Sequence, residues 1–334
     1  MNSLELYWYV MGVGLVAYVL TGGADFGGGV WDLLASGPRR DEMRKAVEDA
    51  IAPIWEANHV WLIFVVVVMF TVFPRAFAVV GTALHIPLTL ALIGIVLRGT
   101  AFTFRAYGLE PDHRRRAWGR VFAWSSALTP IFLGAALGGA STGAIRLSDG
   151  QVTTGFFAGW TTVFAGLVGL FALALFVLLA AVYLTADTTG PVQEEFRRRA
   201  IVSEVVAGVL AAGVFWRARI DAPPLYDHLA GSDWTWIVQT VTALLAFSTL
   251  ALVWFRRYHL ARFTVAGQVA MVVVGWGLAM DGHIVLPDLA LADSGSHSSV
   301  RAAMTPALLV GTLLLAPALL FLFHVFKSGP RSAS

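Results

Sequence analysis

The chain has 334 residues, of which 57% are hydrophobic and only 13% are charged. A soluble domain carries about 25% charged residues, and a soluble protein of this size could not remove so much apolar surface from water. The net charge of +2 gives no indication of a nucleic-acid partner, and the absence of cysteine excludes disulfides, thiolate metal sites and cysteine nucleophiles. The composition is that of a polytopic membrane protein.

Uncharged runs long enough to cross a bilayer recur along the whole sequence. A helix needs about 20 apolar residues to span the hydrocarbon core, and these runs are too long for barrel strands and lack their alternation. Breaking the chain at its charged clusters predicts nine transmembrane helices, over residues 6–26, 51–73, 76–98, 118–140, 156–184, 200–217, 234–256, 263–286 and 303–326. The expected fold is an all-α integral membrane protein in which 1–334 form a single transmembrane domain, with two four-helix halves plus one extra helix.

Lys and Arg residues are unevenly distributed between alternate connections. They concentrate after the first, third, fifth, seventh and ninth spans, whereas the other connections hold few. Cytoplasmic segments carry the excess of positive charge in membrane proteins. The pattern predicts a periplasmic N-terminus and a cytoplasmic C-terminus, with Arg98 at the inner end of the third span.

Four carboxylates fall within or beside the expected spans, where a charge costs about 2.5–3.5 kcal/mol on insertion scales. Asp25 ends the first span, Glu56 opens the second, Glu204 lies early in the sixth and Asp281 lies late in the eighth. None has a Lys or Arg within one helical turn in sequence. Each must therefore find a partner on another helix, reach water or bind a proton.

A glycine-rich segment surrounds Asp25. The glycines between Gly22 and Gly29 allow the backbone to leave helical geometry and allow neighbouring helices to approach closely. Two interpretations stay open, a flexible helix end with Asp25 in interfacial water or a carboxylate held against the bundle. A phosphate-binding loop is poorly supported, because no Gly-Lys-Ser/Thr follows the glycines.

A second polar segment opens the second span. Glu56 and His59 are three residues apart and share a helix face, and Trp55 and Asn58 form another such pair. A proton carrier needs groups that titrate near neutrality and lie within one water of each other, which Glu56 and His59 satisfy. The other interpretation is an interfacial belt, with Trp55 and Trp61 as anchors and Glu56 as a capping carboxylate.

Three histidines lie in or beside the expected spans. A bis-histidine haem needs two imidazoles at matched depth on facing helices. His85 is expected at mid-membrane, His324 near the inner end of its span and His283 near the outer end. The favoured interpretation for each is a hydrogen-bonded polar side chain, and no metal site is predicted.

Two segments resemble signatures of subunit II of the cytochrome bd quinol oxidases. Residues 22–29 resemble the family's Gly-Phe-Asp-x-Gly-x-Gly signature, and residues 51–63 resemble Pro-x-Trp-Asp-Gly-Asn-x-Val-Trp-Leu-Ile. Further similar segments follow in the family's order, at 97–105, 181–188, 275–279 and 323–327. The resemblance therefore extends over the whole chain.

The resemblance implies a subunit of a quinol oxidase complex in the bacterial cytoplasmic (inner) membrane that reduces O2 to water and generates a proton gradient. In this family the partner, subunit I, ligates haem b and haem d and oxidises quinol, and a small accessory subunit is a further candidate partner. Subunit II binds no haem, is needed for assembly and supports proton delivery from the cytoplasm. Some members hold a structural quinone.

The resemblance also implies roles for particular residues of this chain. The family's carboxylates fall on Glu56 and Asp25, and we expect them to form a proton pathway with His59. Candidate structural polar contacts are Asn58, Trp55 and Arg98.

The chain departs from the family pattern at several of these positions. Gly22 stands where many relatives have an Asp, and Glu56 stands where they have Asp, which adds one methylene of reach. Ala57 replaces a Gly, and His59 replaces an acid or amide. The chain is expected to be a divergent relative.

Two other classes of function stay open from the residues alone. A proton-coupled secondary transporter would use Glu56, Glu204 and Asp281 as a relay, and it would work without a haem-bearing partner. An autonomous b-type cytochrome would be ligated by His85 and would contain haem in the isolated chain.

Overall fold

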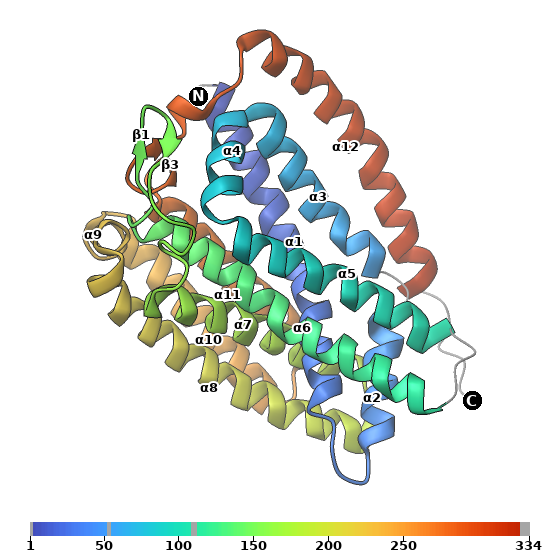
Figure 1. Cartoon of the computed structure of the whole chain (residues 1–334). Coiled ribbons are helices and arrows are strands. Elements are labelled where there is room, and N and C mark those ends of the chain that lie inside the picture. Colours follow the sequence, from blue (N-terminus) through green and yellow to red (C-terminus); the bar gives the residue numbers. More distant parts are fainter. Residues whose placement is uncertain (1–2, 52–54, 108–111, 328–334) are drawn as a thin grey trace.

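The computed structural model describes residues 3–51, 55–107 and 112–327, most of which are helical (Figure 1). The first helices are α1 (Ser3–Leu33), α2 (Arg40–Ile51), α3 (Trp55–Val72), α4 (Pro74–Ala83), α5 (His85–Tyr107) and α6 (Asp112–Ser141). The later helices are α7 (Val163–Asp187), α8 (Gly190–Asp221), α9 (Pro223–Gly231), α10 (Thr235–Trp254), α11 (Tyr258–Ala279) and α12 (Ser298–Lys327).

Eight of the described helices are long and apolar enough to cross a membrane. They are α1, α5, α6, α7, α8, α10, α11 and α12. Helices α2 and α3 add a ninth span if this pair, bent by 53°, counts as one. The all-α, multi-span fold is confirmed, whereas its orientation in the membrane and its division into two halves stay predictions.

Helix α1 continues about two turns beyond the expected end at residue 26, so that Asp25 lies inside a helix. The glycines do not interrupt it. A Cβ atom on Gly27 would lie 1.9 Å from the carbonyl oxygen of Phe176 on α7, and one on Gly29 would lie 2.2 Å from Oγ of Ser126 on α6. The glycines therefore permit close helix packing, and the interpretation of a flexible helix end does not hold.

The span expected at 76–98 is divided in the structure. Helix α4 ends at Ala83 and α5 begins at His85, two residues before Pro87. Proline lacks the N–H that a helix interior needs and its ring clashes with the preceding turn, so one helix through Pro87 is disfavoured. Helix α5 then runs to Tyr107, which places Arg98 inside a helix and not at its end.

The fifth and sixth spans also differ from their expected bounds of 156–184 and 200–217. Helix α7 starts at Val163, where the preceding Thr162 accepts a hydrogen bond from the backbone N–H of Ala165. Helix α8 starts at Gly190, with Pro191 in its first turn, where a missing N–H costs no hydrogen bond. The arginine cluster that was expected to precede this span lies within the helix.

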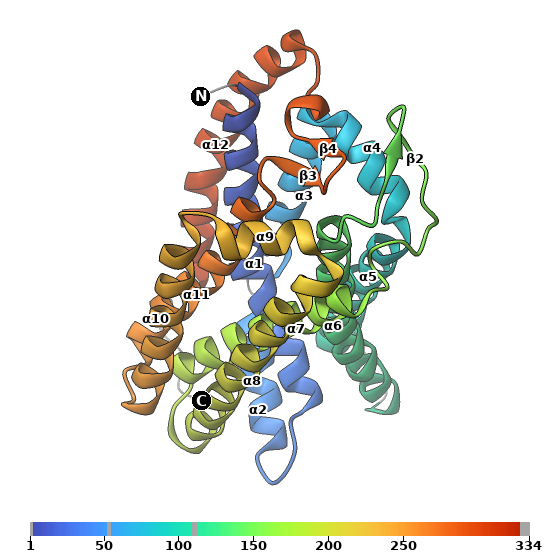
Figure 2. The same cartoon turned by 90° about the vertical axis from the view of Figure 1, so that its left-hand side faces the viewer.

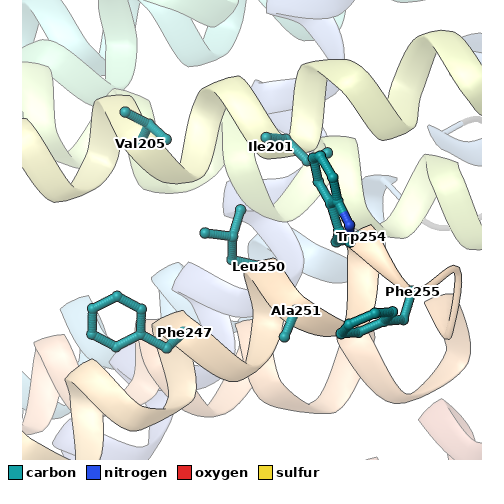
Figure 3. A pocket seen from close by; sticks show the side chains of 7 residues that line it. All are labelled: Ile201, Val205, Phe247, Leu250, Ala251, Trp254 and Phe255. Carbon is teal, nitrogen blue, oxygen red and sulfur yellow. The ribbon is translucent and has the colours of Figure 1, made fainter.

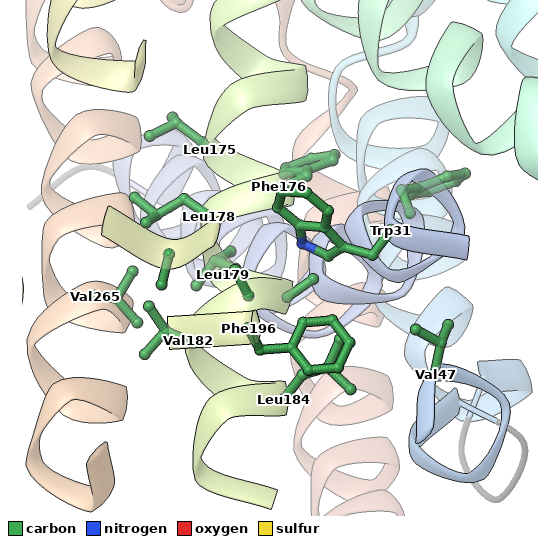
Figure 4. Packing of buried hydrophobic residues seen from close by; sticks show 14 of the residues in the cluster. Trp31, Val47, Leu175, Phe176, Leu178, Leu179, Val182, Leu184, Phe196 and Val265 are labelled. Carbon is green, nitrogen blue, oxygen red and sulfur yellow. The ribbon is translucent and has the colours of Figure 1, made fainter. Parts of the chain in front are cut away.

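The apolar core centres on α1 and α7 (Figure 4). Side chains from α1, α2, α7, α8 and α11 form one cluster, which includes Trp31, Val47, Phe176, Phe196 and Val265. The indole N–H of Trp31 donates a hydrogen bond to the carbonyl oxygen of Val177 at 2.9 Å. This contact fixes the C-terminal part of α1 against α7.

Helix α12 lies apart from this core, and none of its described side chains is buried between Ser298 and Leu319 (Figures 1 and 2). It packs against α3, and the hydroxyl of Tyr7 on α1 donates a hydrogen bond of 2.7 Å to the carbonyl oxygen of Arg301. The N-terminal ends of α1 and α12 therefore lie at the same end of the molecule.

Two short hairpins lie at this end of the bundle. Strand β1 (Leu147–Ser148) pairs with β2 (Gln151–Val152), and β3 (His283–Val285) pairs with β4 (Leu289–Ala290), which precedes the 3-10 turn η1 (Ala292–Ser294). Asp288 joins the hairpins by accepting hydrogen bonds from Arg146 Nε at 2.8 Å and Nη2 at 3.1 Å. This guanidinium holds the pKa of Asp288 below its usual range.

Candidate functional site

Polar side chains from α1, α3 and α5 meet around Asp25. The Asp25 side chain is 5% exposed, and its Oδ2 accepts a hydrogen bond of 2.7 Å from Nδ2 of the buried Asn58. Burial of a carboxylate is costly unless it is hydrogen-bonded or paired with a charge. Asn58, predicted as a polar contact, is the α3 side chain that meets this requirement.

Arg98 is the buried positive charge of the same site. It is 1% exposed and attracts Asp25 electrostatically. Its Cζ lies 4.9 Å from the ring centroid of Phe26 and 5.3 Å from that of Phe122, distances at which a guanidinium interacts with an aromatic face. Its Nε and Nη2 have no hydrogen-bond partner among the described residues. Two rings and the charge of Asp25 therefore surround the guanidinium.

His59 joins the site from α3, between two aromatic rings. Its ring centroid lies 6.0 Å from that of Tyr18 and 5.9 Å from that of Phe26. A Cβ atom on Gly22, where the family resemblance predicts an Asp, would lie 2.8 Å from the Tyr18 ring. The ring therefore occupies the space that an acidic side chain at residue 22 would need.

We name the four residues that meet here the Asp25 cluster. Its members are Asp25, Asn58, His59 and Arg98.

A second acid–arginine contact lies two helical turns further along α1 and α5. Asp32 follows Asp25 by seven residues and Arg105 follows Arg98 by seven, an interval that returns to the same helix face. Asp32 is buried, and its Oδ2 lies 2.8 Å from Nη1 of Arg105. The Phe122 ring lies beside both guanidinium groups, with Cζ distances of 5.3 and 5.8 Å.

Helix α2 supplies further charges to this contact. Nε of Arg44 lies 3.7 Å from Oδ1 of Asp32, and Oε2 of Glu48 lies 3.5 Å from Nη2 of Arg105. We name these four residues the Asp32 group. Sequence reasoning missed the group because it placed Asp32 outside the first span, although the repeated seven-residue interval was a detectable signal.

Glu56, the expected proton carrier, lies outside the Asp25 cluster. Its side chain is exposed in the first turn of α3, and no hydrogen bond or ion pair joins it to another described residue. A helix N-terminus stabilises a carboxylate at this position. The side chain of Trp55, predicted as a polar contact, lies outside the described residues.

The three carboxylates of the transporter alternative do not come together. Asp281 was expected late in the eighth span but lies beyond the end of α11, where its exposed side chain is 3.7 Å from His228 Nε2. Glu204 is buried on α8 and bonded by Gln268 on α11. The relay from Glu56 through these two residues is therefore not formed.

Two of the histidines considered as haem ligands lie outside the helix interiors. His85 was expected at mid-span, but it begins α5, where its Nδ1 contacts the Thr82 carbonyl oxygen at 2.8 Å and its ring packs against Phe156. His283 lies in β3 and contacts the preceding turn. The side chain of His324 lies outside the described part of the chain. Within that part, no group of three or more His, Asp or Glu side chains is arranged to hold a metal ion.

An apolar groove lies between α8 and α10 (Figure 3). Its lining consists of Ile201, Val205, Phe247, Leu250, Ala251, Trp254 and Phe255. The indole N–H is the one polar hydrogen among these side chains. The groove therefore has the character of a lipid-facing surface, and its lining gives no polar anchor for the structural quinone that the family resemblance suggested.

Known proteins similar to this chain are subunits of bd oxidases. Cytochrome bd-I ubiquinol oxidase subunit 2 of Escherichia coli (strain K12) is 27% identical over 236 residues, which cover 68% of this chain and 62% of that protein. Cytochrome bd ubiquinol oxidase subunit 2 of Bacillus subtilis (strain 168) is 27% identical over 216 residues, which cover 63% and 62%. The matched part thus spans less than two thirds of either relative.

The fold matches over a longer range than these alignments. A chain of the bd oxidase from Geobacillus thermodenitrificans superposes with a TM-score of 0.81 at 22% identity, covering 98% of this chain and 99% of that one. The family model described as Cytochrome bd terminal oxidase subunit II matches residues 4–326. The protein is a multi-span helical protein of the bacterial inner membrane. The chain belongs to the cytochrome bd terminal oxidase subunit II family.

Proposed function

We propose that this chain is the haem-free subunit of a quinol oxidase complex, in which it helps to deliver cytoplasmic protons for the reduction of O2 to water. The family membership and the helical fold support an association with a haem-bearing subunit I. Haem b and haem d in that partner would carry electrons from quinol to oxygen. This chain would contribute to assembly and to the proton supply that generates the gradient.

The observation that carries the proposal is the column of polar groups inside an apolar bundle. The Asp32 group and the Asp25 cluster lie about 10 Å apart along α1, since each residue advances an α-helix by 1.5 Å. A small cavity beside Asp32 is lined in part by Glu48, Arg105 and Phe122. By the predicted orientation, this column starts at the cytoplasmic end and extends into the membrane.

We propose that Glu56, outside this column, exchanges protons with water and that His59 and Asp25, within it, support their transfer inward. Glu56 is exposed, which suits a group that collects protons, and His59 lies three residues further along the same helix. Asn58 and Arg98 hold Asp25 in place through a hydrogen bond and an opposite charge. Their role is to position this carboxylate.

The test is a Glu56→Gln variant of the assembled complex. We expect oxygen consumption with quinol, and proton uptake from the cytoplasmic side of vesicles, to fall by about 100-fold, the lower end of the effect of removing a positioned proton-transfer group. Haem content and the ratio of subunits should stay unchanged. Glu56→Asp should keep most of the activity, because it keeps a titratable carboxylate at this position.

A matched control is Glu42→Gln, which removes another exposed carboxylate, on α2. We expect it to leave both rates unchanged. Full turnover and full proton uptake by an intact Glu56→Gln complex would contradict the assignment of Glu56. Loss of haem or of the partner would instead show that Glu56 acts in assembly.

A further inference from the structure

A third buried carboxyl group lies on α8, apart from the Asp25 cluster and the Asp32 group. Glu204 is 7% exposed, and its Oε1 accepts a hydrogen bond of 2.7 Å from Nε2 of Gln268, which is 5% exposed on α11. Glu204 lies about 20 Å along the axis of α8 from its first residue, Gly190. The pair therefore lies within the helical bundle and not at its ends (α8 and α11 in Figure 2).

The pair leaves two oxygen atoms without donors. Oε2 of Glu204 and Oε1 of Gln268 are buried and have no hydrogen-bond partner among the described residues. Buried acceptors are normally satisfied, because each unsatisfied one costs the full free energy of its desolvation. A proton on the Glu204 carboxyl group would supply the donor that these two oxygen atoms lack.

Positive charge does not compensate Glu204 either. In the described part of the chain, burial and the Gln268 hydrogen bond are what affects the charge state of Glu204. No Lys, Arg or His there forms an ion pair with it. Asp25 differs in this respect, because Arg98 lies beside it.

Four helices, α1, α7, α9 and α10, pack against α8 or α11, and three of them carry titratable side chains. Helix α10 has none. The other three carry Tyr183 and Asp187 on α7, Tyr226, Asp227 and His228 on α9, and Glu5, Tyr7, Tyr9, Tyr18, Asp25 and Asp32 on α1. Helix α11 itself carries Tyr258, His259 and Arg262, and α8 carries Glu194, Glu195, Arg197, Arg198, Arg199, Arg217, Arg219 and Asp221. Arg262, the cation nearest to Gln268 in sequence, is paired with Asp187.

We infer that Glu204 is a proton-binding site, held as an uncharged carboxylic acid with the Gln268 amide as its partner. An ionised carboxylate here would place an uncompensated charge in an apolar bundle. A proton on Oε2 removes that charge and turns this oxygen into a donor, for which Oε1 of Gln268 is the complementary acceptor. The ligand of the site is a proton, and the inference does not depend on the proposed oxidase function.

The test is infrared spectroscopy of the purified, assembled complex at neutral pH, with glutamate labelled by carbon-13. The C=O stretch of a protonated carboxyl group lies apart from the bands of carboxylates and amides. We expect a protonated-glutamate band that shifts in D2O and is lost in Glu204→Gln. Glu195→Gln is the matched control on the same helix, because Glu195 is partly exposed and lies 3.5 Å from Arg39, and it should keep the band.

A second variant, Gln268→Leu, tests the inference even if the Glu204→Gln complex fails to assemble. A protonated Glu204 would keep its band in this variant and shift it to higher frequency, because the amide hydrogen bond is gone. The absence of any protonated-glutamate band in the wild type would overturn the inference. So would a band that persists at full intensity in Glu204→Gln, or one that does not shift in Gln268→Leu.

Discussion

Replacement of Arg98 by Gln should destabilise this protein far more than the loss of an exposed arginine. Arg98 is 1% exposed and Asp25 is 5% exposed, so bulk water solvates neither charge. Removing the guanidinium alone leaves the Asp25 charge buried, with the Asn58 amide still donating to it. Breaking one side of a buried charge pair costs about 3–5 kcal/mol, and the lost contacts with Phe26 and Phe122 add to this.

A second change, Asp25→Asn, separates the effect of charge from the effect of packing. In the double variant no uncompensated charge stays buried, because both charged groups have been replaced by amides. The double variant should therefore be more stable than the sum of the two single effects predicts, with a coupling free energy of about 1–3 kcal/mol.

The assay is thermal unfolding in mild detergent, followed by the fluorescence of the 12 tryptophans. Arg198→Gln is the matched control, since the Arg198 side chain is 69% exposed and lies 3.8 Å from Glu194. An exposed ion pair contributes about 0–1 kcal/mol. The reasoning is refuted if Arg98→Gln and the control destabilise the protein equally, or if the two changes at the buried pair are strictly additive.

Two further predictions concern the helix packing and the hairpin end of the bundle. Gly27→Ala should cost about 1–3 kcal/mol in the same assay, because its Cβ would meet the Phe176 carbonyl oxygen, whereas Gly12→Ala, with nothing within 4 Å, should stabilise α1 by up to about 1 kcal/mol. Effects of the same sign would contradict the packing argument. The Arg146 guanidinium lowers the pKa of Asp288 from its ordinary value of 3.8, so this carboxylate stabilises the fold above that value and loses its contribution as pH falls through the folded-state pKa. Asp288→Asn should therefore flatten the fall of the unfolding temperature below about pH 4, and an unchanged slope would contradict this.

The sequence was sufficient to predict the fold class because the bilayer constrains it so strongly. Every span must satisfy its own backbone and present apolar side chains to lipid, so long uncharged runs identify the helices. The ends of the helices were less predictable. Each expected span was assumed to stop at the first charged residue, although a charged residue can lie inside a helix. The structure continues α1 beyond Asp25 and α5 beyond Arg98, because the two charges are beside each other and neither has to reach water.

The composition of the candidate site was predictable, but its geometry was not. The Asn58 amide meets Asp25 while Glu56, two residues earlier, is exposed, because successive residues of an α-helix point in directions about 100° apart. Which face of α3 meets α1 depends on packing between helices distant in sequence. No sequence pattern showed that Gln268 would bond Glu204 from another helix.

The glycines and the carboxylates of α1 act together, although they look like separate motifs in the sequence. Asp25, Gly29 and Asp32 follow at intervals of four and three residues, which places them on one helix face. A Cβ atom on Gly29 would lie 3.3 Å from the Phe122 ring, so the small residue allows α6 to bring that ring against α1. The same ring lies beside the guanidinium groups of Arg98 and Arg105. The close approach of α6 therefore helps to hold two acid–arginine contacts inside an apolar bundle. This explains why a glycine lies between the two acids on this face of α1.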